Sequence, residues 1–246
     1  MSDASWSYSS YSTAMQCLRK YKHIYIDKLQ PEQDSGDLKF GSAIHSAVNG
    51  ALEGEDGEAL FSLYWSSYAN ASLQYGRFKH DALASIGGDF MRKFAKFYIP
   101  RLKPVIMEQR AYGEYKGMKV EGTLDFYGEL DGVPSLIDWK TTAWNYDKDK
   151  TLNALQLHLY AYLCITEHKL IPQQIVYFPF VKSKSSIQEP VILPLDTKRM
   201  YALLDDMQRY VNSFAAVGDA KNPNSCLMGM LKCPFFDKCW RDNAGT

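Results

Sequence analysis

The fold and the chemistry of this sequence depend on two short stretches, GTLD at residues 122–125 and LIDWKTT at residues 136–142. Each is typical of the end of a β-strand, and an Asp-Gly turn signal lies between them. A turn at that point brings the two strands side by side, so the carboxylates of Asp125 and Asp138 are predicted to meet. Because side chains alternate along a strand, Lys140 points to the same side as Asp138.

Two carboxylates and a lysine in this arrangement suit phosphodiester hydrolysis. That reaction needs a divalent metal on the phosphate, an activated water molecule and neutralisation of the charge in the transition state. Mg²⁺ and Mn²⁺ prefer oxygen ligands, which the carboxylates supply. Lys140 is placed to orient or deprotonate the water, or to offset charge. An Asp-x-Lys strand alone is common and is most often a solvated edge, but the apolar residues before it and the second acid favour catalysis.

The surrounding elements indicate an α/β fold with a central mixed sheet flanked by helices. The sequence from 1 to 246 is predicted to be one domain, with a mainly helical part at 1–103, a core at 104–195 and a C-terminal helix and cysteine-rich segment at 196–246. Apolar periodicity and turn residues predict helices over 8–26, 40–52, 58–76, 81–99, 152–167 and 197–214. Strands are predicted over 105–115, 118–130, 135–140, 175–181 and 190–195, with irregular structure over 31–39 and from residue 218 onward.

A strand Asp, a turn and Asp-x-Lys at the end of the next strand resemble the core of the PD-(D/E)xK nucleases. The Gly-x-x-Asp and Asp-x-Lys-Thr forms found here resemble the RecB-like branch. That branch includes the RecB and AddB nuclease domains, phage exonucleases and the iron–sulfur nuclease of CRISPR adaptation. The resemblance spans roughly residues 8–240 and implies a restriction-endonuclease-like core that uses Mg²⁺ or Mn²⁺.

Further motifs of the branch occur here in the expected order. A Gly-x-x-x-His setting matches His45, and Gln-x-x-x-Tyr on a later helix matches Gln156 and Tyr160. Glu108 is the candidate for the acid on the first core strand, with Glu114 and Glu121 as weaker alternatives near the hairpin. A histidine flanked by apolar helix residues is otherwise most often structural. The resemblance implies metal ligation by His45, Asp125, Asp138 and the Trp139 carbonyl, an auxiliary role for Glu108, water activation by Lys140, and positioning of DNA or the lysine by Gln156 and Tyr160.

The cysteines form a second pattern. Cys226, Cys233 and Cys239 are spaced C-x6-C-x5-C, and Cys17 is on the first predicted helix. Together they resemble the cysteines that hold an iron–sulfur cluster in AddB and the CRISPR nuclease, although the first gap is usually two residues there. Four thiolates with no nearby histidine suit a 4Fe–4S cluster, with a structural Zn²⁺ as the less favoured alternative. Cys164 lies in an apolar run and is predicted to be a buried small hydrophobe.

Composition limits the function classes. The chain has 246 residues, 46% of them apolar, and a formal net charge of zero, which argues against a nucleic-acid coat protein but allows a local basic groove. No apolar run reaches the roughly 20 residues of a membrane span, and we find no secretory signal, so a cytoplasmic protein is expected. The candidate phosphate contacts are Arg19, Lys20, Lys22, Arg92, Lys93, Lys96, Lys182 and Lys184, and the candidate base-stacking residues are Tyr8, Tyr11, Trp144 and Tyr146.

The sequence therefore predicts a metal-dependent deoxyribonuclease that acts as an exonuclease on single-stranded DNA or on DNA with free ends. Its expected partners are recombination, repair or CRISPR adaptation proteins. The alternative is a non-catalytic module that uses the same fold to bind DNA or a partner. A small iron–sulfur redox protein is a third interpretation, but it leaves the ordered nuclease motifs unexplained.

Overall fold

A six-stranded mixed sheet forms the centre of the protein, described here from a computed structural model over residues 5–30, 34–143, 145, 148–184, 186–228 and 231–241. The order β3-β4-β5-β6-β7 runs across the sheet, and β8 also pairs with β6. Strands β5 and β6 are parallel and the other neighbours are antiparallel. The strands are β3 (Leu102–Tyr115), β4 (Met118–Leu130), β5 (Val133–Thr142), β6 (Gln174–Val181), β7 (Ser186–Ile187) and β8 (Val191–Pro194).

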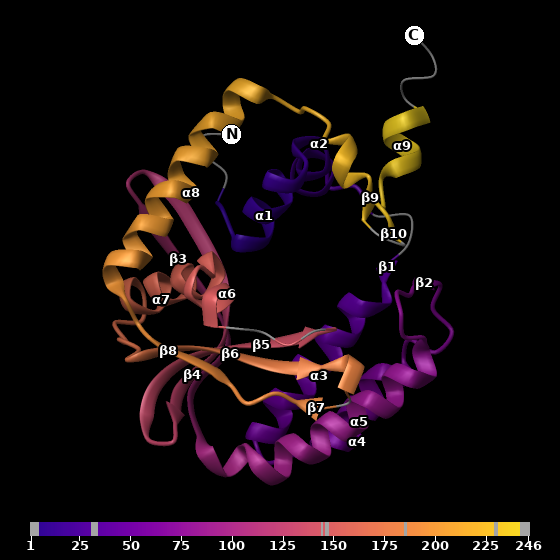
Figure 1. The fold of residues 1–246 in the computed structure, drawn as a ribbon, viewed down its shortest axis with the longest axis vertical. Coiled ribbons are helices and arrows are strands. Elements are labelled where there is room, and N and C mark those ends of the chain that lie inside the picture. Colours follow the sequence, from indigo (N-terminus) through magenta and orange to yellow (C-terminus); the bar gives the residue numbers. More distant parts are fainter. Residues whose placement is uncertain are drawn as a thin grey trace.

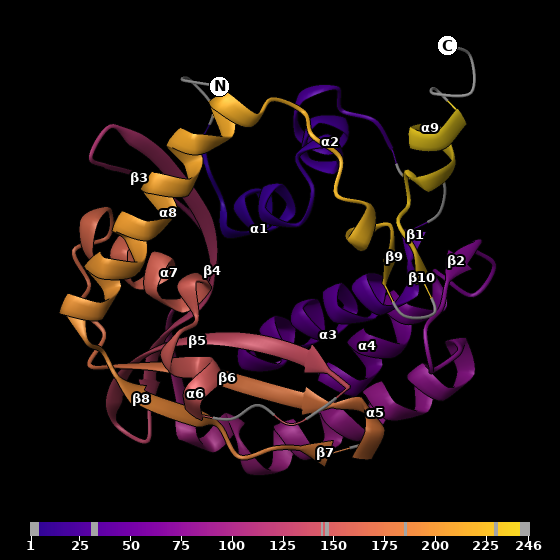
Figure 2. The same ribbon diagram turned by 45° about the horizontal axis from the view of Figure 1, so that its top comes forward.

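Helices cover both faces of the sheet (Figure 1). On one face α3 (Gly36–Leu52), α4 (Gly57–Ser66) and α5 (His80–Phe97) pack an aromatic core with the sheet. On the other face lie α1 (Tyr8–Gln16), α7 (Leu155–Thr166) and α8 (Thr197–Val217), as the turned view in Figure 2 shows. Together with α6 (Lys148–Leu152), α7 forms the crossover that a parallel β5–β6 pair requires.

The two central strands diverge at the point that matters for function. Strands β4 and β5 pair from Leu130 and Val133 only as far as Phe126 and Ile137. Beyond that point the earlier residues of β4 stay paired with β3, and the later residues of β5 pair with β6. The main chains therefore form a fork, and the next residue on each arm is an aspartate.

The N-terminal helical region differs from the prediction. In place of one helix over 8–26, α1 stops before Cys17, whose backbone is extended (φ −165°, ψ 116°). The helix resumes as α2 (Leu18–Tyr21) and continues as a π-helical segment, Lys22–Ile26. The interruption turns the Cys17 side chain towards residue 220. The Sγ atom of Cys17 lies 3.9 Å from the Ala220 carbonyl oxygen.

Three other boundaries were predicted wrongly. The helix expected over 58–76 ends at Ser66, where the Ser66 and Ser67 hydroxyls bond to backbone carbonyls of the last turn and compete with further helix. Strands β1 (Asp34–Ser35) and β2 (Leu73–Gln74) then pair, and α3 begins inside the expected 31–39 loop. The segment after residue 218 is not irregular throughout, since it contains β9 (Leu227–Met228), β10 (Leu231–Lys232) and α9 (Phe236–Arg241).

Segments far apart in the sequence hold the upper part of the molecule together. Before α1, Trp6 adds to the edge of β4 through backbone hydrogen bonds with Lys119 and Glu121. The carbonyl of Gln16 accepts hydrogen bonds from Asn222 Nδ2 at 2.8 Å and Ser225 Oγ at 3.0 Å. Of the helices in the described ranges, none is both long and apolar enough to cross a membrane.

Candidate active site

Three side chains from three different elements converge at the fork. His45 comes from α3, Glu108 from β3 and Asp125 from β4, and one potential ligand atom of each lies within 4.8 Å of the others. The Nδ1 atom of His45 is 3.7 Å from Glu108 Oε1 and 3.7 Å from Asp125 Oδ1. A histidine with two carboxylates is a donor set suited to a divalent cation.

The backbone at Glu108 is unusual and helps to form this group. Its φ of 46° lies in the left-handed region, which residues other than glycine rarely adopt. The flanking pairs Met107–Phe126 and Gln109–Leu124 place Glu108 opposite Asp125. Backbone strain of this kind is concentrated at functional sites, which is consistent with a precise requirement for the Glu108 carboxylate beside His45.

Asp138 and Lys140 lie next to this group rather than inside it. Lys140 Nζ is 2.7 Å from Asp138 Oδ2, and the Asp138 side chain is 1% exposed. The other carboxylate oxygen, Oδ1, is buried and has no hydrogen-bond partner among the described residues. A buried carboxylate oxygen without a hydrogen-bond partner, close to the acids Glu108 and Asp125, is suited to bind a cation. The residues present therefore fit a divalent metal.

The backbone of Trp139 links the two arms of the fork. Its N–H donates a hydrogen bond to Asp125 Oδ2 at 3.0 Å, and its carbonyl oxygen lies 2.8 Å from His45 Nε2. The Trp139 ring points to the opposite side and is fully buried against Phe94, Phe126 and Phe178. The side-chain alternation predicted for β5 is therefore present, and the aromatic core fixes the backbone that orients the acids.

Burial and mutual repulsion shape the titration of the site. Burial, followed by the charge of Asp138, raises the pKa of Asp125 to about 7. Burial opposes protonation of His45, but Glu108, Asp125 and Asp138 outweigh it and raise the histidine pKa. Burial likewise opposes a charged Lys140, but the Asp138 carboxylate outweighs it and raises the lysine pKa. The site therefore holds excess negative charge that a cation would relieve.

Gln156 and Tyr160 lie on α7 on the other side of Lys140. Gln156 Nε2 donates to Tyr160 Oη at 3.1 Å. Burial, followed by the charge of Asp138, raises the pKa of Tyr160 to about 12, so its hydroxyl keeps its proton. A Cβ atom on Gly122 would come within 2.6 Å of the Tyr160 ring, so the glycine three residues before Asp125 makes room for this tyrosine.

Asn49 is a residue of the site that sequence reasoning missed. It lies one turn after His45 on α3 and makes a side-chain hydrogen bond that helps to lower the pKa of Glu108, after the larger effect of His45. Both helix residues border an open cavity of about 660 Å³ that also reaches Trp139 and Lys140. The i, i+4 spacing from His45 is the sequence signal that could have identified Asn49.

The four predicted cluster cysteines are brought together at the other end of the molecule. Cys17, Cys226, Cys233 and Cys239 all line one small cavity of about 40 Å³. Among the described residues no three cysteine sulfurs lie within 4.8 Å of one another.

The expectation that no histidine is near these cysteines was wrong. His23 Nε2 lies 3.5 Å from Cys239 Sγ, and its ring packs against Phe235 with the centroids 5.3 Å apart. The π-helical segment that contains His23 turns it towards the cysteines, and helical periodicity alone gives no sign of this contact. Cys164, in contrast, is fully buried in the sheet core, and burial raises its pKa to about 12, as expected for a small hydrophobe.

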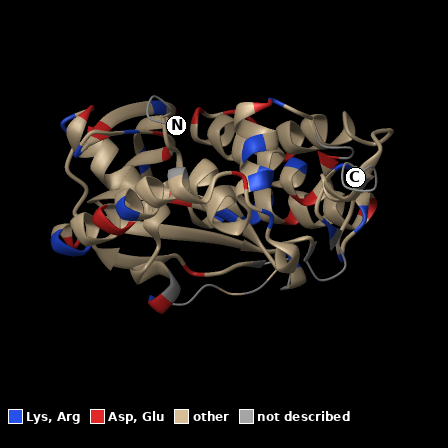
Figure 3. Ribbon diagram, turned by 90° about the horizontal axis from the view of Figure 1, so that it is seen from above, with Lys and Arg blue, Asp and Glu red and all other residues tan. Residues whose placement is uncertain are grey.

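Several candidate phosphate contacts are already paired with acids. Arg19 pairs with Asp219, Lys22 with Asp27, Arg92 with Glu58 and Asp89, and Lys182 with Asp37. Lys and Arg are interspersed with Asp and Glu in the view from above (Figure 3). Trp144 and Tyr146 lie outside the described residues, as does the side chain of Lys184.

A histidine and clustered acids at the fork of a mixed sheet define a metal-binding centre of hydrolytic type, and comparison with known proteins gives the family. A sequence model of the PD-(D/E)XK nuclease superfamily matches residues 5–239. A crystal structure from Eubacterium rectale, of a protein provisionally named an exonuclease, aligns over 98% of this chain and 94% of that chain with a TM-score of 0.61 and 12% identity. At that identity the likeness shows a shared fold alone.

Two further comparisons add no functional information. The crystal structure of SSO0001 aligns over 83% of this chain and 95% of that chain at 17% identity, but its TM-score of 0.32 is too low to bear on the fold. A search of curated proteins finds no match. Because the superfamily match covers nearly the whole sequence, the chain belongs to the PD-(D/E)XK nuclease superfamily, whose members use divalent metals.

Proposed function

We propose that this protein is a deoxyribonuclease of the RecB-like branch that hydrolyses DNA from free or single-stranded ends with Mg²⁺ or Mn²⁺. The observation that carries the proposal is the fork itself, where buried Asp125 and Asp138 begin the two arms and Lys140 is paired with Asp138. A non-catalytic module would gain nothing from such closely spaced buried acids, which repel one another without a cation.

Each residue has a role in this proposal. Asp125, Asp138, His45 and the Trp139 carbonyl would hold the metal, and Glu108 would be an auxiliary acid. The metal when bound polarises the phosphate and lowers the pKa of water. Lys140, in its charged form, orients the attacking water and offsets charge on the phosphate, while Gln156 and Tyr160 position Lys140 and the DNA strand.

The test of this function is metal-dependent digestion of end-labelled single-stranded and double-stranded DNA. We expect cleavage with Mg²⁺ or Mn²⁺ and no cleavage in EDTA. Shortening of the labelled strand one nucleotide at a time identifies exonuclease action. Cleavage that persists in EDTA, or no cleavage of any end with either metal, contradicts the proposal.

His45→Ala is expected to weaken metal binding rather than remove the reactive groups. His45 contributes one neutral ligand, and Glu108, Asp125 and Asp138 remain. We therefore expect the Mg²⁺ concentration for half-maximal cleavage to rise by about 10–100-fold, with recovery of rate at saturating metal. His80→Ala serves as the control, because that histidine stacks on Trp65 of α4 and is outside the His45, Glu108 and Asp125 group. An unchanged metal dependence in His45→Ala rules out ligation by His45.

We further propose that Cys17, Cys226, Cys233 and Cys239 hold a 4Fe–4S cluster, with Zn²⁺ as the less favoured occupant. Their common cavity supports a shared metal group, and four thiolate ligands suit a 4Fe–4S cluster. The cluster would tie residue 17 to residues 226–239 and so have a mainly structural role. It would add to the hydrogen bonds that already join Gln16 to Asn222 and Ser225.

Cys233→Ala is expected to give poorly soluble protein without the brown colour of a cluster. Cys164→Ala is the matched control, since Cys164 is buried in the core and its loss removes packing but no ligand. The measurements are visible absorption and iron, sulfide and zinc content of the purified proteins. A brown, well-folded Cys233→Ala protein contradicts the assignment.

A further inference from the structure

A second cavity lies beside the proposed active site and is used by none of the roles above. It has a volume of about 450 Å³ and lies between α1, the start of α7, β6 and α8. That volume falls within the roughly 300–1,000 Å³ of small-molecule pockets.

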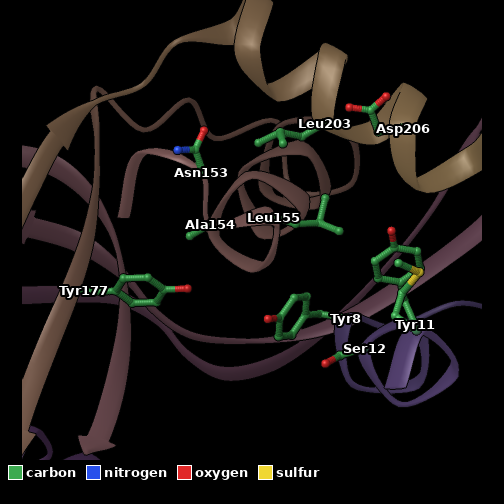
Figure 4. Close-up of a pocket in the computed structure, with 10 residues that line it drawn as sticks. Tyr8, Tyr11, Ser12, Asn153, Ala154, Leu155, Tyr177, Leu203 and Asp206 are labelled. Atoms are coloured by element: carbon green, nitrogen blue, oxygen red, sulfur yellow. The ribbon is translucent and has the colours of Figure 1, made fainter. Parts of the chain in front are cut away.

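The cavity has aromatic walls. Figure 4 shows Tyr8 and Tyr177 on opposite sides of it, with their hydroxyls directed towards each other, and Ala154 and Leu155 also line the cavity. Tyr11 stands further back, against Phe214 of α8. Burial raises the pKa of Tyr11 to about 12, so this ring stays neutral. Flat neutral rings of this kind stack on planar aromatic ligands.

The cavity lining offers no cation to a phosphate. Among the described residues that line it, none is Lys or Arg, and the carboxylate of Asp206 is paired with Arg209. Asn153 is held in place by a hydrogen bond from Arg199 Nη1 at 2.9 Å. An aromatic cavity with an amide and a carboxylate at its rim suits an uncharged ring whose edge carries hydrogen-bond donors and acceptors. A nucleobase has this chemistry.

Tyr177 connects the cavity to the proposed reaction centre. It pairs in register with Asp138 across β5 and β6, and Lys140 Nζ lies 5.8 Å from the centroid of its ring. In a nucleotide only one sugar separates the base from the phosphate. A base held between Tyr8 and Tyr177 therefore brings a phosphate of the same nucleotide or its neighbour towards Lys140.

We propose that this tyrosine cavity binds one unpaired nucleobase of the strand being cut, an inference that rests on the proposed nuclease function. Stacking tolerates every base because each has an aromatic face. A paired base cannot enter without leaving the duplex, which costs free energy. The cavity thus favours single-stranded DNA or frayed ends, and it places the scissile phosphate by holding a base.

The test uses Tyr8→Ala, which removes one wall, with Tyr8→Phe as the conservative variant. Tyr112→Ala is the control, because Tyr112 is an exposed tyrosine of β3 that does not line the cavity. The substrates are end-labelled single strands, either intact or with one abasic residue placed at successive positions around a cut site. Melting temperatures establish that each variant is folded.

For the wild type we expect one abasic position to lower kcat/KM by roughly tenfold or more, the factor that corresponds to a lost base stack. Tyr8→Ala should lower kcat/KM on the intact strand by a similar factor, with little further loss at that abasic position, because both changes remove the same contact. Tyr8→Phe keeps the ring and should keep the abasic penalty, and Tyr112→Ala should behave as the wild type. An abasic penalty of equal size in the wild type and Tyr8→Ala overturns the proposal.

A binding measurement separates this proposal from the nuclease function. Single strands carrying 2-aminopurine at successive positions are titrated with Lys140→Ala protein in Mg²⁺. We expect fluorescence quenching at one position, lost when Tyr8→Ala is added to Lys140→Ala. If the wild type shows no metal-dependent cleavage, the nuclease function fails, whereas such quenching still supports the cavity. Cleavage with no base-sensitive position and no Tyr8-dependent quenching supports the nuclease and overturns the cavity.

Discussion

Lys140→Ala is expected to reduce metal-dependent DNA cleavage by at least about a hundredfold to a thousandfold while DNA binding survives. The lysine is the cation closest to Asp138, at 2.7 Å, and its loss removes a charge that we propose acts on the water and the phosphate. Metal affinity should stay the same or increase, because the carboxylates keep their charges. The measurements are single-turnover cleavage of end-labelled DNA and binding of the same DNA by fluorescence anisotropy.

The controls for this variant address folding and charge. Removing Lys140 leaves the buried Asp138 carboxylate without its partner, so some loss of stability is expected without metal. Lys140→Arg keeps the positive charge but changes its shape, and should retain stability with cleavage reduced at least about tenfold. Lys103→Ala removes a lysine of β3 whose side chain is 77% exposed, and should leave both properties unchanged. Full cleavage by folded Lys140→Ala contradicts the proposed mechanism.

Asp125→Asn is expected to abolish cleavage and at the same time to stabilise the metal-free protein at neutral pH. The asparagine oxygen can still accept the hydrogen bond that Trp139 N–H donates to Asp125. The substitution removes a buried charge that lies next to Asp138 and whose pKa is raised to about 7 by burial and by that neighbour. Removing the Asp125 charge from a site built for a cation therefore makes the metal-free protein more stable and leaves it without activity.

The pH dependence gives this prediction its sign. The raised pKa means that folded Asp125 holds its proton in a range where the unfolded carboxyl, with its ordinary pKa of 3.8, has lost it. The contribution of Asp125 to the unfolding free energy therefore falls as pH rises from about 4 to 7, and then levels. With about 1.4 kcal/mol for each unit of pKa, we expect Asp125→Asn to be more stable than the wild type by roughly 2–4 kcal/mol at pH 8 in EDTA.

Denaturant unfolding of both proteins in EDTA at pH 4, 6 and 8 measures this difference, which should be near zero at pH 4. Adding Mg²⁺ should stabilise the wild type and not the variant, since binding to the native state alone raises stability. A difference that is independent of pH would show that Asp125 has an ordinary pKa. Equal stabilisation by Mg²⁺ would exclude Asp125 as a metal ligand.

Strand positions in the core were predictable because their signals are local. The β3–β4 and β4–β5 turns lie at Lys116-Gly117 and Asp131-Gly132, where both residues of each turn have positive φ. With the turns fixed, alternation alone puts Asp138 and Lys140 on one side and Trp139 on the other. The range predicted for β4, 118–130, agrees with the structure for the same reason.

The fork was not predictable from these signals. It arises because β5 continues past Ile137 beside β6, a strand that follows it only after two helices. The left-handed backbone of Glu108 is also set by tertiary structure, as no glycine or turn residue marks it in the sequence. Sequence motifs therefore indicated which residues gather, but not that His45, Glu108 and Asp125 form one group with ligand atoms within 4.8 Å of one another.

Periodicity gave no sign of the helix interruption at Cys17, although the cysteine motif linked Cys17 to residues 226–239. Its extended backbone interrupts a pattern that reads as continuous helix, and the partners that accompany the interruption are 200 or more residues away. The same holds for His23 and Cys239. Candidate phosphate contacts such as Lys182 are paired with acidic side chains that only the fold brings near them. For Lys182 the acid is Asp37. Long-range pairings of this kind are outside the reach of periodicity and turn chemistry.

The attachment of Gln16 to Asn222 and Ser225 has a consequence for the order of events during synthesis. Helix α1 carries Tyr8 and Tyr11, one wall of the tyrosine cavity, and it is anchored by residues made more than 200 positions later. A ribosome adds roughly 5–20 residues each second, so the catalytic carboxylates emerge well before that wall is secured. In the proposed function, a nascent chain therefore has its acids before the wall that would hold a strand is anchored.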